Sequence, residues 1–154
     1  MLNKADGKVG FKNEAELEKF VYGHLDELLN LQPIAKQYRV DSDICDILAV
    51  DEQRRLSIIE LKNVEDRYVV QQLTRYYDSL LGEKPFADLV NYENTIRLIA
   101  ISPSFHNHNF VDKNYARLEF EFWSFDIAAN KGRRDISFKL TNVDNNNKKY
   151  RQLN

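Results

Sequence analysis

Two acidic residues and a lysine interrupt two short apolar segments of this chain, where a protein normally places its core. Asp46 lies within residues 44–50, and Glu60 and Lys62 lie within residues 56–62. Side chains alternate between the two faces of a strand, so each charged residue shares a face with aliphatic neighbours. We therefore take these three residues as the first candidates for chemistry.

A short polar loop, residues 51–55, separates the two segments. A symmetric hairpin around this loop pairs Val50 with Leu56 and therefore brings Asp46 opposite Glu60. Opposed Cβ atoms in such a pair are about 4.5–5.5 Å apart, and like charges there are destabilising. Two carboxylates on an apolar face call for a cation, and a divalent metal fits beside the lysine that follows.

The alternative is a salt bridge between Lys62 and one carboxylate on a partly exposed face, since such networks resemble functional clusters. That arrangement leaves Asp46 and Glu60 sharing one lysine, which is one carboxylate too many. Mg²⁺ usually takes one or two protein carboxylates and completes its shell with water and substrate phosphate. The sequence thus favours a Mg²⁺ site, with Mn²⁺ as a substitute, suited to phosphodiester hydrolysis.

The elements that position these residues follow from apolar periodicity and from end signals. Asn13 and Glu16 form a capping box at the start of the first predicted helix. Helices are expected over residues 14–29 and 65–81, with shorter ones at 86–92 and 109–115. Strands are expected over residues 34–41, 44–50, 56–62, 95–102, 117–125 and 135–141. The order αβββαβ(α)ββ predicts an α/β (α+β) fold, a mixed sheet flanked by helices.

Length and composition set broader bounds. The 154 residues predict one domain over residues 1–141 and a polar, flexible tail over residues 142–154. The net charge of -2 gives no overall attraction to nucleic acid, so any such surface must be local. A single cysteine, Cys45, and the lack of a signal-like or membrane-spanning apolar run predict a cytoplasmic location.

The motifs, taken in order, resemble the PD-(D/E)xK nuclease superfamily. Asp46 lies on one strand, Glu60-Leu61-Lys62 on the next, and a Q-x-x-x-Y pattern, Gln72 to Tyr76, on the following helix. The segments DILAVD, IELK, QLTRY and RLIAISPSF are similar to the C-terminal nuclease domain of NucS (EndoMS)-type DNA endonucleases, a restriction-endonuclease-like core. The likeness covers roughly residues 11–125.

Two departures from this family pattern concern the surroundings of the motifs. The chain has Asp43 where the NucS-type domain has a glycine, and it shows no counterpart of that family's N-terminal domain. That domain contributes to DNA binding and dimerisation. Catalytic chemistry is therefore expected to carry over more readily than the substrate and partner surface.

The resemblance implies a metal-dependent DNA endonuclease acting through a metal-activated water. Its catalytic centre would use Asp46, Glu60 and Lys62, and the metal would bind the two carboxylates and the main-chain carbonyl of Leu61. A glutamate of the first helix, Glu14 or alternatively Glu18, often reaches the metal site in this fold. The implied partners are DNA and either a second copy of the chain or a separate DNA-binding subunit.

Gln72 and Tyr76 lie four residues apart and so share a helix face. By resemblance they border the catalytic cleft, whereas the plainer interpretation makes Tyr76 a core residue and Gln72 a solvated one. Two alternative functions also remain at this stage. One is a non-catalytic nucleic-acid or protein-interaction module on the same fold, and the other is an RNA-directed nuclease.

Overall fold

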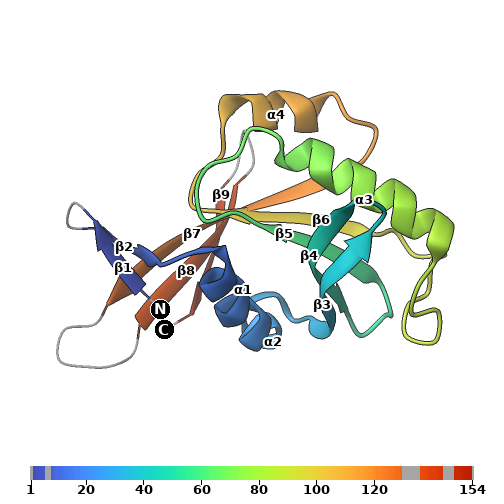
Figure 1. Ribbon diagram of the computed structural model, residues 1–154, viewed down its shortest axis with the longest axis horizontal. Coiled ribbons are helices and arrows are strands. Elements are labelled where there is room, and N and C mark those ends of the chain that lie inside the picture. Colours follow the sequence, from blue (N-terminus) through green and yellow to red (C-terminus); the bar gives the residue numbers. More distant parts are fainter. Residues whose placement is uncertain (1, 6–7, 130–135, 144–147, 154) are drawn as a thin grey trace.

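A computed structural model describes residues 2–5, 8–129, 136–143 and 148–153 of the chain (Figure 1). The strands are β1 (Leu2–Ala5), β2 (Lys8–Phe11), β3 (Gln32–Val40), β4 (Asp43–Val50), β5 (Leu56–Leu61), β6 (Arg97–Ser102), β7 (Phe120–Ala129), β8 (Ile136–Val143) and β9 (Lys148–Leu153). The helices are α1 (Glu14–Gly23), α2 (Leu25–Leu29), α3 (Val69–Glu83) and α4 (Asn107–Asn114).

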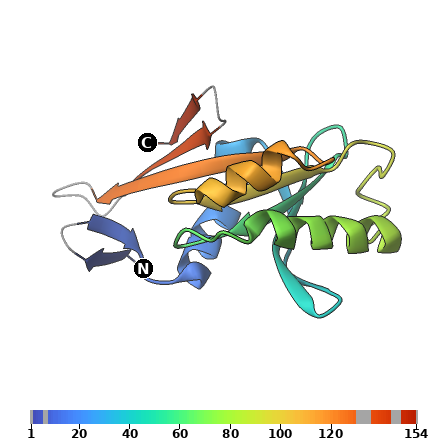
Figure 2. The same ribbon diagram turned by 90° about the horizontal axis from the view of Figure 1, so that it is seen from above.

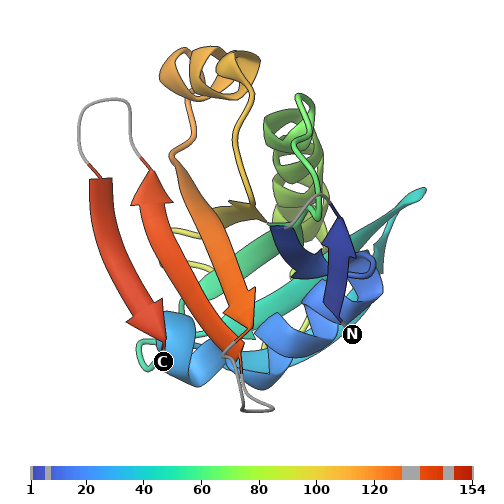
Figure 3. The ribbon, with the colours of Figure 1, turned by 90° about the vertical axis from the view of Figure 1, so that its left-hand side faces the viewer.

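Seven strands form one mixed sheet in the order β3-β4-β5-β6-β7-β8-β9. β5, β6 and β7 run parallel to one another, and the other neighbours pair antiparallel. Figure 3 shows β7, β8 and β9 following one another at one end of this sheet. The predicted mixed sheet flanked by helices is confirmed, and an N-terminal hairpin of β1 and β2, which the sequence did not predict, is added.

Alternation along the central strands creates a core on each face of the sheet. Ile59 and Leu61 of β5 pack in one core with α1 and α2, whereas Ile58 packs in the other core with α3. Helices α1 and α2 cover one face in Figure 1, and α3 and α4 cover the other. Figure 2 shows α4 lying beside α3. Glu60, two residues after Ile58, therefore belongs to the α3 face.

The first predicted helix is two helices, because the chain breaks at His24. This residue leaves helical geometry with φ -125° and ψ 17°. Its Nδ1 lies 2.7 Å from the carbonyl oxygen of Phe20, and the two rings stack. Asn30 ends α2 in the left-handed conformation, directly after the range predicted for the helix.

None of the helices in the described ranges has the length and apolar character needed to span a bilayer.

The helix predicted over residues 65–81 begins later, at Val69. The Asp66 Oδ1 accepts the N–H of Tyr68 at 2.7 Å, a local turn that competes with helix formation. The helix continues past residue 81, where the sequence predicts its end, to Glu83, and the next residue, Lys84, takes the left-handed conformation. The residues between Lys62 and α3 are consequently a loop, and this loop borders the site described below.

Two further expectations were wrong in detail. Residues 86–92 form a turn and not a short helix: the N–H groups of Leu89 and Val90 both bind the carbonyl of Phe86, which has φ 55°. The polar segment from Asn142 onward is also not only a tail. β8 continues to Val143, and β9 pairs with it at the edge of the sheet, where main-chain hydrogen bonds tolerate polar side chains.

Candidate active site

The hairpin of β4 and β5 has the register expected from the symmetric loop. Val50 pairs with Leu56 and Leu48 with Ile58, and the ladder continues to the pair of Ile47 and Ile59. At the next position a side-chain contact takes the place of main-chain pairing. The Oδ2 of Asp46 accepts the main-chain N–H of Leu61 at 2.7 Å. Asp46 is thereby held against the carboxyl end of β5.

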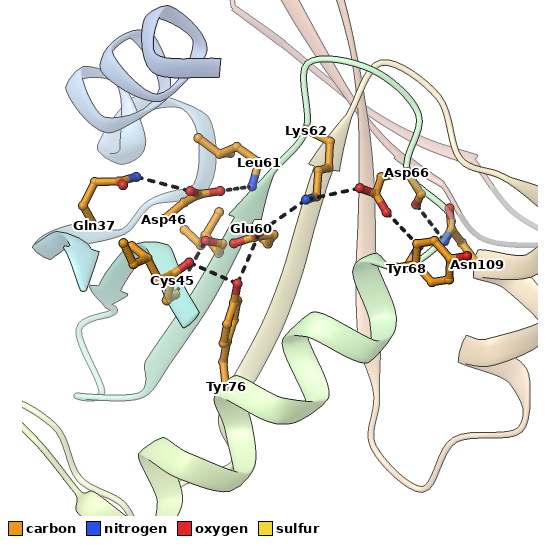
Figure 4. Close-up of polar contacts among 12 residues, drawn as sticks. Gln37, Cys45, Asp46, Glu60, Leu61, Lys62, Asp66, Tyr68, Tyr76 and Asn109 are labelled. Carbon is orange, nitrogen blue, oxygen red and sulfur yellow. Dashed lines mark hydrogen bonds and ion pairs between the residues drawn. The ribbon is translucent and has the colours of Figure 1, made fainter. Parts of the chain in front are cut away.

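Glu60 lies buried near the end of strand β5, with 4% of its surface exposed. Its Oε2 is 3.5 Å from the hydroxyl of Tyr76 and 3.5 Å from the Nζ of Lys62 (Figure 4). Its Oε1 is buried and has no hydrogen-bond partner within the described residues. A buried carboxylate oxygen normally has a partner, so this atom is available to accept from or to bind a ligand.

The electrostatics of Asp46 and Glu60 point the same way. Burial raises the pKa of Asp46, and the N–H of Leu61 offsets part of that rise. Burial and then the charge of Asp46 raise the pKa of Glu60 to about 9, with Lys62 opposing. Without a cation the pair therefore keeps a proton at neutral pH, and a divalent ion would supply the charge that removes it.

Lys62 extends between two carboxylates at the point where β5 ends. Its N–H donates to the carbonyl of Ile101 at 2.8 Å, which fixes the main chain. Its Nζ lies 3.5 Å from Glu60 Oε2 and 3.4 Å from Asp66 Oδ2. Burial alone lowers the pKa of Lys62, but the charges of Glu60, Asp66 and Glu14 outweigh it and raise the pKa. The side chain is an ammonium at neutral pH.

Helix α3 carries both candidate residues, Gln72 and Tyr76, one turn apart. The Tyr76 hydroxyl donates to the carbonyl of Ile44 at 3.0 Å and faces Glu60 (Figure 4). Tyr76 is thus both a core residue and a contact of the site. Gln72, one turn earlier, has a buried Oε1 with no hydrogen-bond partner among the described residues. Two side-chain oxygens of this region, one on Glu60 and one on Gln72, remain without a partner.

The first helix reaches the site through an intermediary. Glu18 Oε2 accepts the Nε2 of Gln37 at 2.6 Å, and the same Nε2 lies 3.3 Å from Asp46 Oδ1. Glu14 makes no hydrogen bond or ion pair with any described residue, although its charge raises the pKa of Lys62. Both glutamates therefore act near the site, Glu18 on the Asp46 side and Glu14 on the Lys62 side.

Gln37 has an unusual backbone for a strand residue. Its φ is 51°, in the left-handed region that residues other than glycine rarely adopt. The neighbouring pairs of β3 and β4 are Lys36 with Ile47 and Tyr38 with Cys45, which leaves Gln37 opposite Asp46. Strained residues concentrate at functional sites, and this one directs an amide at a candidate catalytic carboxylate.

The donor set fits a hard divalent ion that retains several waters. Within the described ranges, no group of three or more His, Cys, Asp or Glu side chains could hold a metal ion. Asp46 and Glu60 supply two carboxylates, and one Glu60 oxygen is unpartnered. This number of carboxylates is typical of Mg²⁺, which completes its octahedron with water and substrate oxygen. The same set suits zinc poorly, because zinc prefers sulfur and nitrogen ligands.

The sequence did not predict Gln37, Asp66 or Asn109 as part of the site. Gln37 could have been found by extending the hairpin pairing to β3, which places it opposite Asp46. Asp66 could have been suspected from its position four residues after Lys62. Asn109 binds the carbonyl of Asp66 at 3.1 Å from a separate helix, and no local pattern marks that contact.

Solved structures with a similar fold come from nucleases. A structure of EndoMS in complex with double-stranded DNA has a TM-score of 0.58 and 18% identity, covering 79% of this chain and 49% of that one. A repair endonuclease from Pyrococcus abyssi has a TM-score of 0.51 and 24% identity, covering 71% of this chain and 46% of that one. The chain thus spans about half the length of either solved protein.

Sequence comparison assigns the family. A search of curated proteins finds no match. The family model described as "Endonuclease NucS C-terminal domain" matches residues 13–115, which include Asp46, Glu60, Lys62 and both α3 residues. On this match the chain belongs to the family of NucS endonuclease C-terminal domains.

Proposed function

We propose that this chain is a metal-dependent DNA endonuclease that hydrolyses phosphodiester bonds with a metal-activated water. The observation that carries the proposal is the pair of half-buried Asp46 and buried Glu60, with Glu60 Oε1 unpartnered and Lys62 Nζ 3.5 Å from Oε2. Family membership and the solved nucleases of the same fold support the reaction class. DNA as substrate follows the EndoMS structure, which contains double-stranded DNA.

Asp46 and Glu60 would hold Mg²⁺, or Mn²⁺ in its place, with the carbonyl of Leu61 as a further ligand. When bound, the ion lowers the pKa of a coordinated water and polarises the phosphate. The N–H of Leu61 and the amide of Gln37 keep the Asp46 carboxylate in place. The Tyr76 hydroxyl does the same for Glu60.

Lys62 would stabilise negative charge on the phosphate rather than accept a proton from water. Its raised pKa keeps it an ammonium at neutral pH, and an ammonium can donate to phosphate oxygens but cannot act as a base. Gln72 would accept a hydrogen bond from the attacking water through its unpartnered Oε1, or donate to a phosphate oxygen through Nε2. In the reaction, the water oxygen would form a bond to phosphorus as the bond between phosphorus and the deoxyribose oxygen breaks. The attacking water would give up one proton to solvent, and the leaving oxygen would take one proton from solvent.

A cleavage assay tests this function. Labelled single-stranded, duplex, mismatched and branched DNA would be incubated with the protein and Mg²⁺, Mn²⁺ or a chelator. We expect metal-dependent cutting that falls by about 10²–10³-fold in Lys62→Ala and is lost in Glu60→Gln. If both variants cut DNA as fast as the wild type does, the site would be rejected. A matched RNA panel separates a DNA enzyme from an RNA-directed one, because only RNA carries the 2′-hydroxyl.

Three associated properties are part of the same proposal. One metal centre cuts one strand, so paired cuts require a second copy of the chain or a second visit. The near-neutral charge of -2 means that tight DNA binding would need a local surface or a separate subunit. A cytoplasmic location remains the expectation for such an enzyme.

A further inference from the structure

The loop that joins Lys62 to α3 is fixed at several points. Asn63 Nδ2 donates to the carbonyl of Phe11 at 3.1 Å, which ties the start of the loop to β2. The carbonyl of Asp66 accepts the Nδ2 of Asn109 at 3.1 Å, which ties its middle to α4. Both contacts are between elements far apart in sequence. The loop therefore holds its side chains in set positions beside the site.

Asp66 uses its carboxylate for two different contacts in this loop. Oδ1 accepts the N–H of Tyr68 at 2.7 Å and so shapes the turn before α3. Oδ2 lies 3.4 Å from the Nζ of Lys62. Figure 4 shows Lys62 directed between Glu60 and Asp66, with the two carboxylates on opposite sides of its ammonium. One oxygen of Asp66 stabilises the turn before α3, and the other forms the ion pair with Lys62.

The anchor of this arrangement is Asn109, which is 0% exposed. Its Oδ1 accepts the N–H of His106 at 2.9 Å, and its Nδ2 holds the carbonyl of Asp66. Both ends of the amide are thus used, one to begin α4 and the other to place the Asp66 loop. Among the described residues, no hydrogen bond or ion pair joins α4 to the candidate catalytic trio, so the polar connection of α4 to the site runs through Asp66.

We propose that Asp66 is a positioning residue that holds the Lys62 ammonium between its own carboxylate and that of Glu60, a role that rests on the proposed nuclease function. Lysine carries its charge on a flexible four-carbon chain. Without Asp66, the ammonium would pair with Glu60 alone and compete with the metal for that carboxylate. With Asp66, the ammonium is shared, and it stays at the position where a phosphate oxygen would meet it.

The variant Asp66→Asn tests this role while preserving the turn. An asparagine oxygen can still accept the N–H of Tyr68, whereas the charge toward Lys62 is lost. We expect kcat to fall by about tenfold to a hundredfold, with KM for DNA and the melting temperature little changed. Asp66→Glu, which restores the charge, should recover part of kcat. An Asp66→Asn enzyme with the wild-type kcat would overturn the proposal.

Glu65 provides the matched control. It is the preceding residue of the same loop, and its Oε1 accepts the hydroxyl of Ser104 at 3.2 Å without touching Lys62. Glu65→Gln removes the same charge one residue away, so we expect it to cleave DNA as the wild type does. An equal loss of kcat in Glu65→Gln would mean that loop charge in general matters, and the specific role of Asp66 would be rejected.

A second measurement does not depend on cleavage. The rate at which an amine-reactive reagent acetylates Lys62, followed by mass spectrometry, should rise several-fold in Asp66→Asn and stay unchanged in Glu65→Gln. If the wild type cuts no substrate, the nuclease function fails, yet this rate still reports whether Asp66 restrains Lys62. An unchanged acetylation rate in Asp66→Asn would overturn the positioning role by itself.

Discussion

At the scale of single residues, the site is defined by a carboxylate that the protein leaves incompletely paired. Glu60 is buried against an aliphatic core, yet one of its oxygens has no partner within the described residues. Isolated burial of a charge is costly, and the group responds by holding its proton. The fold therefore carries a destabilising group that a bound cation would relieve.

The first prediction concerns pH and stability without metal. The folded-state pKa of Glu60 is raised from 4.5 to about 9. Between these values the folded state binds more protons than the unfolded state, so stability falls as pH rises through this window. We expect the melting temperature in chelator to drop from pH 6 to pH 8. Glu60→Gln, which cannot ionise, should show a clearly smaller drop, and identical slopes would contradict the burial of this charge.

The second prediction concerns the hydroxyl of Tyr76. Tyr76→Phe removes the hydroxyl that donates to the Ile44 carbonyl and lies 3.5 Å from Glu60 Oε2. We expect a loss of about 1–3 kcal/mol in the free energy of unfolding, measured by denaturant titration, together with slower cleavage. Tyr77→Phe is the control, because the Tyr77 hydroxyl has no hydrogen bond to any described residue. Equal losses in both variants would show that the Tyr76 contacts contribute nothing specific.

At the scale of elements, β3 and α1 supply support that the catalytic strands cannot provide for themselves. Gln37 links Glu18 of α1 to Asp46 of β4, and it does so from a left-handed backbone conformation. That conformation costs about 1–2 kcal/mol for an L-residue. Strand β3 accordingly gives up some stability at the position where it meets the site.

The third prediction separates these two properties of Gln37. Gln37→Gly suits the positive φ but removes the amide from Asp46, so we expect unfolding stability to be kept or slightly raised while cleavage slows. Thermal unfolding and cleavage rates measured on the same preparations check this. Lys36→Gly, at the extended neighbouring position, should instead destabilise by about 1 kcal/mol. A Gln37→Gly protein with full activity would show that the amide is not needed.

The elements also show which parts of the site could be predicted from sequence. The pairing of Asp46 with Glu60 follows from a symmetric loop, and the strands keep that register up to Ile47 and Ile59. Asp66 could not be placed, because the predicted helix included it, whereas in the structure the helix begins only at Val69. A side chain that bends its own backbone through a turn defeats a prediction based on apolar periodicity.

At the scale of the whole molecule, one sheet separates two cores. Leu17 of α1 packs on one face with Trp123, and Leu73 of α3 packs on the other face with Phe122. Since both cores share the same strands, neither can open without exposing the other side of the sheet. The expectation of a single domain, which was drawn from chain length, stays a prediction.

The fourth prediction tests that cooperativity. Trp123 is the only tryptophan and reports on the α1 face, whereas far-ultraviolet circular dichroism reports on the whole chain. We expect the two signals to give coincident unfolding curves. Leu73→Ala, on the opposite face, should shift both curves equally by about 2–5 kcal/mol. A shift in circular dichroism without a shift in Trp123 fluorescence would reveal two independent units.

Titration calorimetry at neutral pH, which measures the binding of Mn²⁺ to the wild type and to Glu60→Gln, is the decisive experiment. The claim is that Asp46 and Glu60 form a metal centre. If they do, the wild type takes up the ion and releases a proton, because Glu60 must ionise to bind it. Glu60→Gln should show neither signal. No uptake by the wild type, or equal uptake by the variant, would contradict the account.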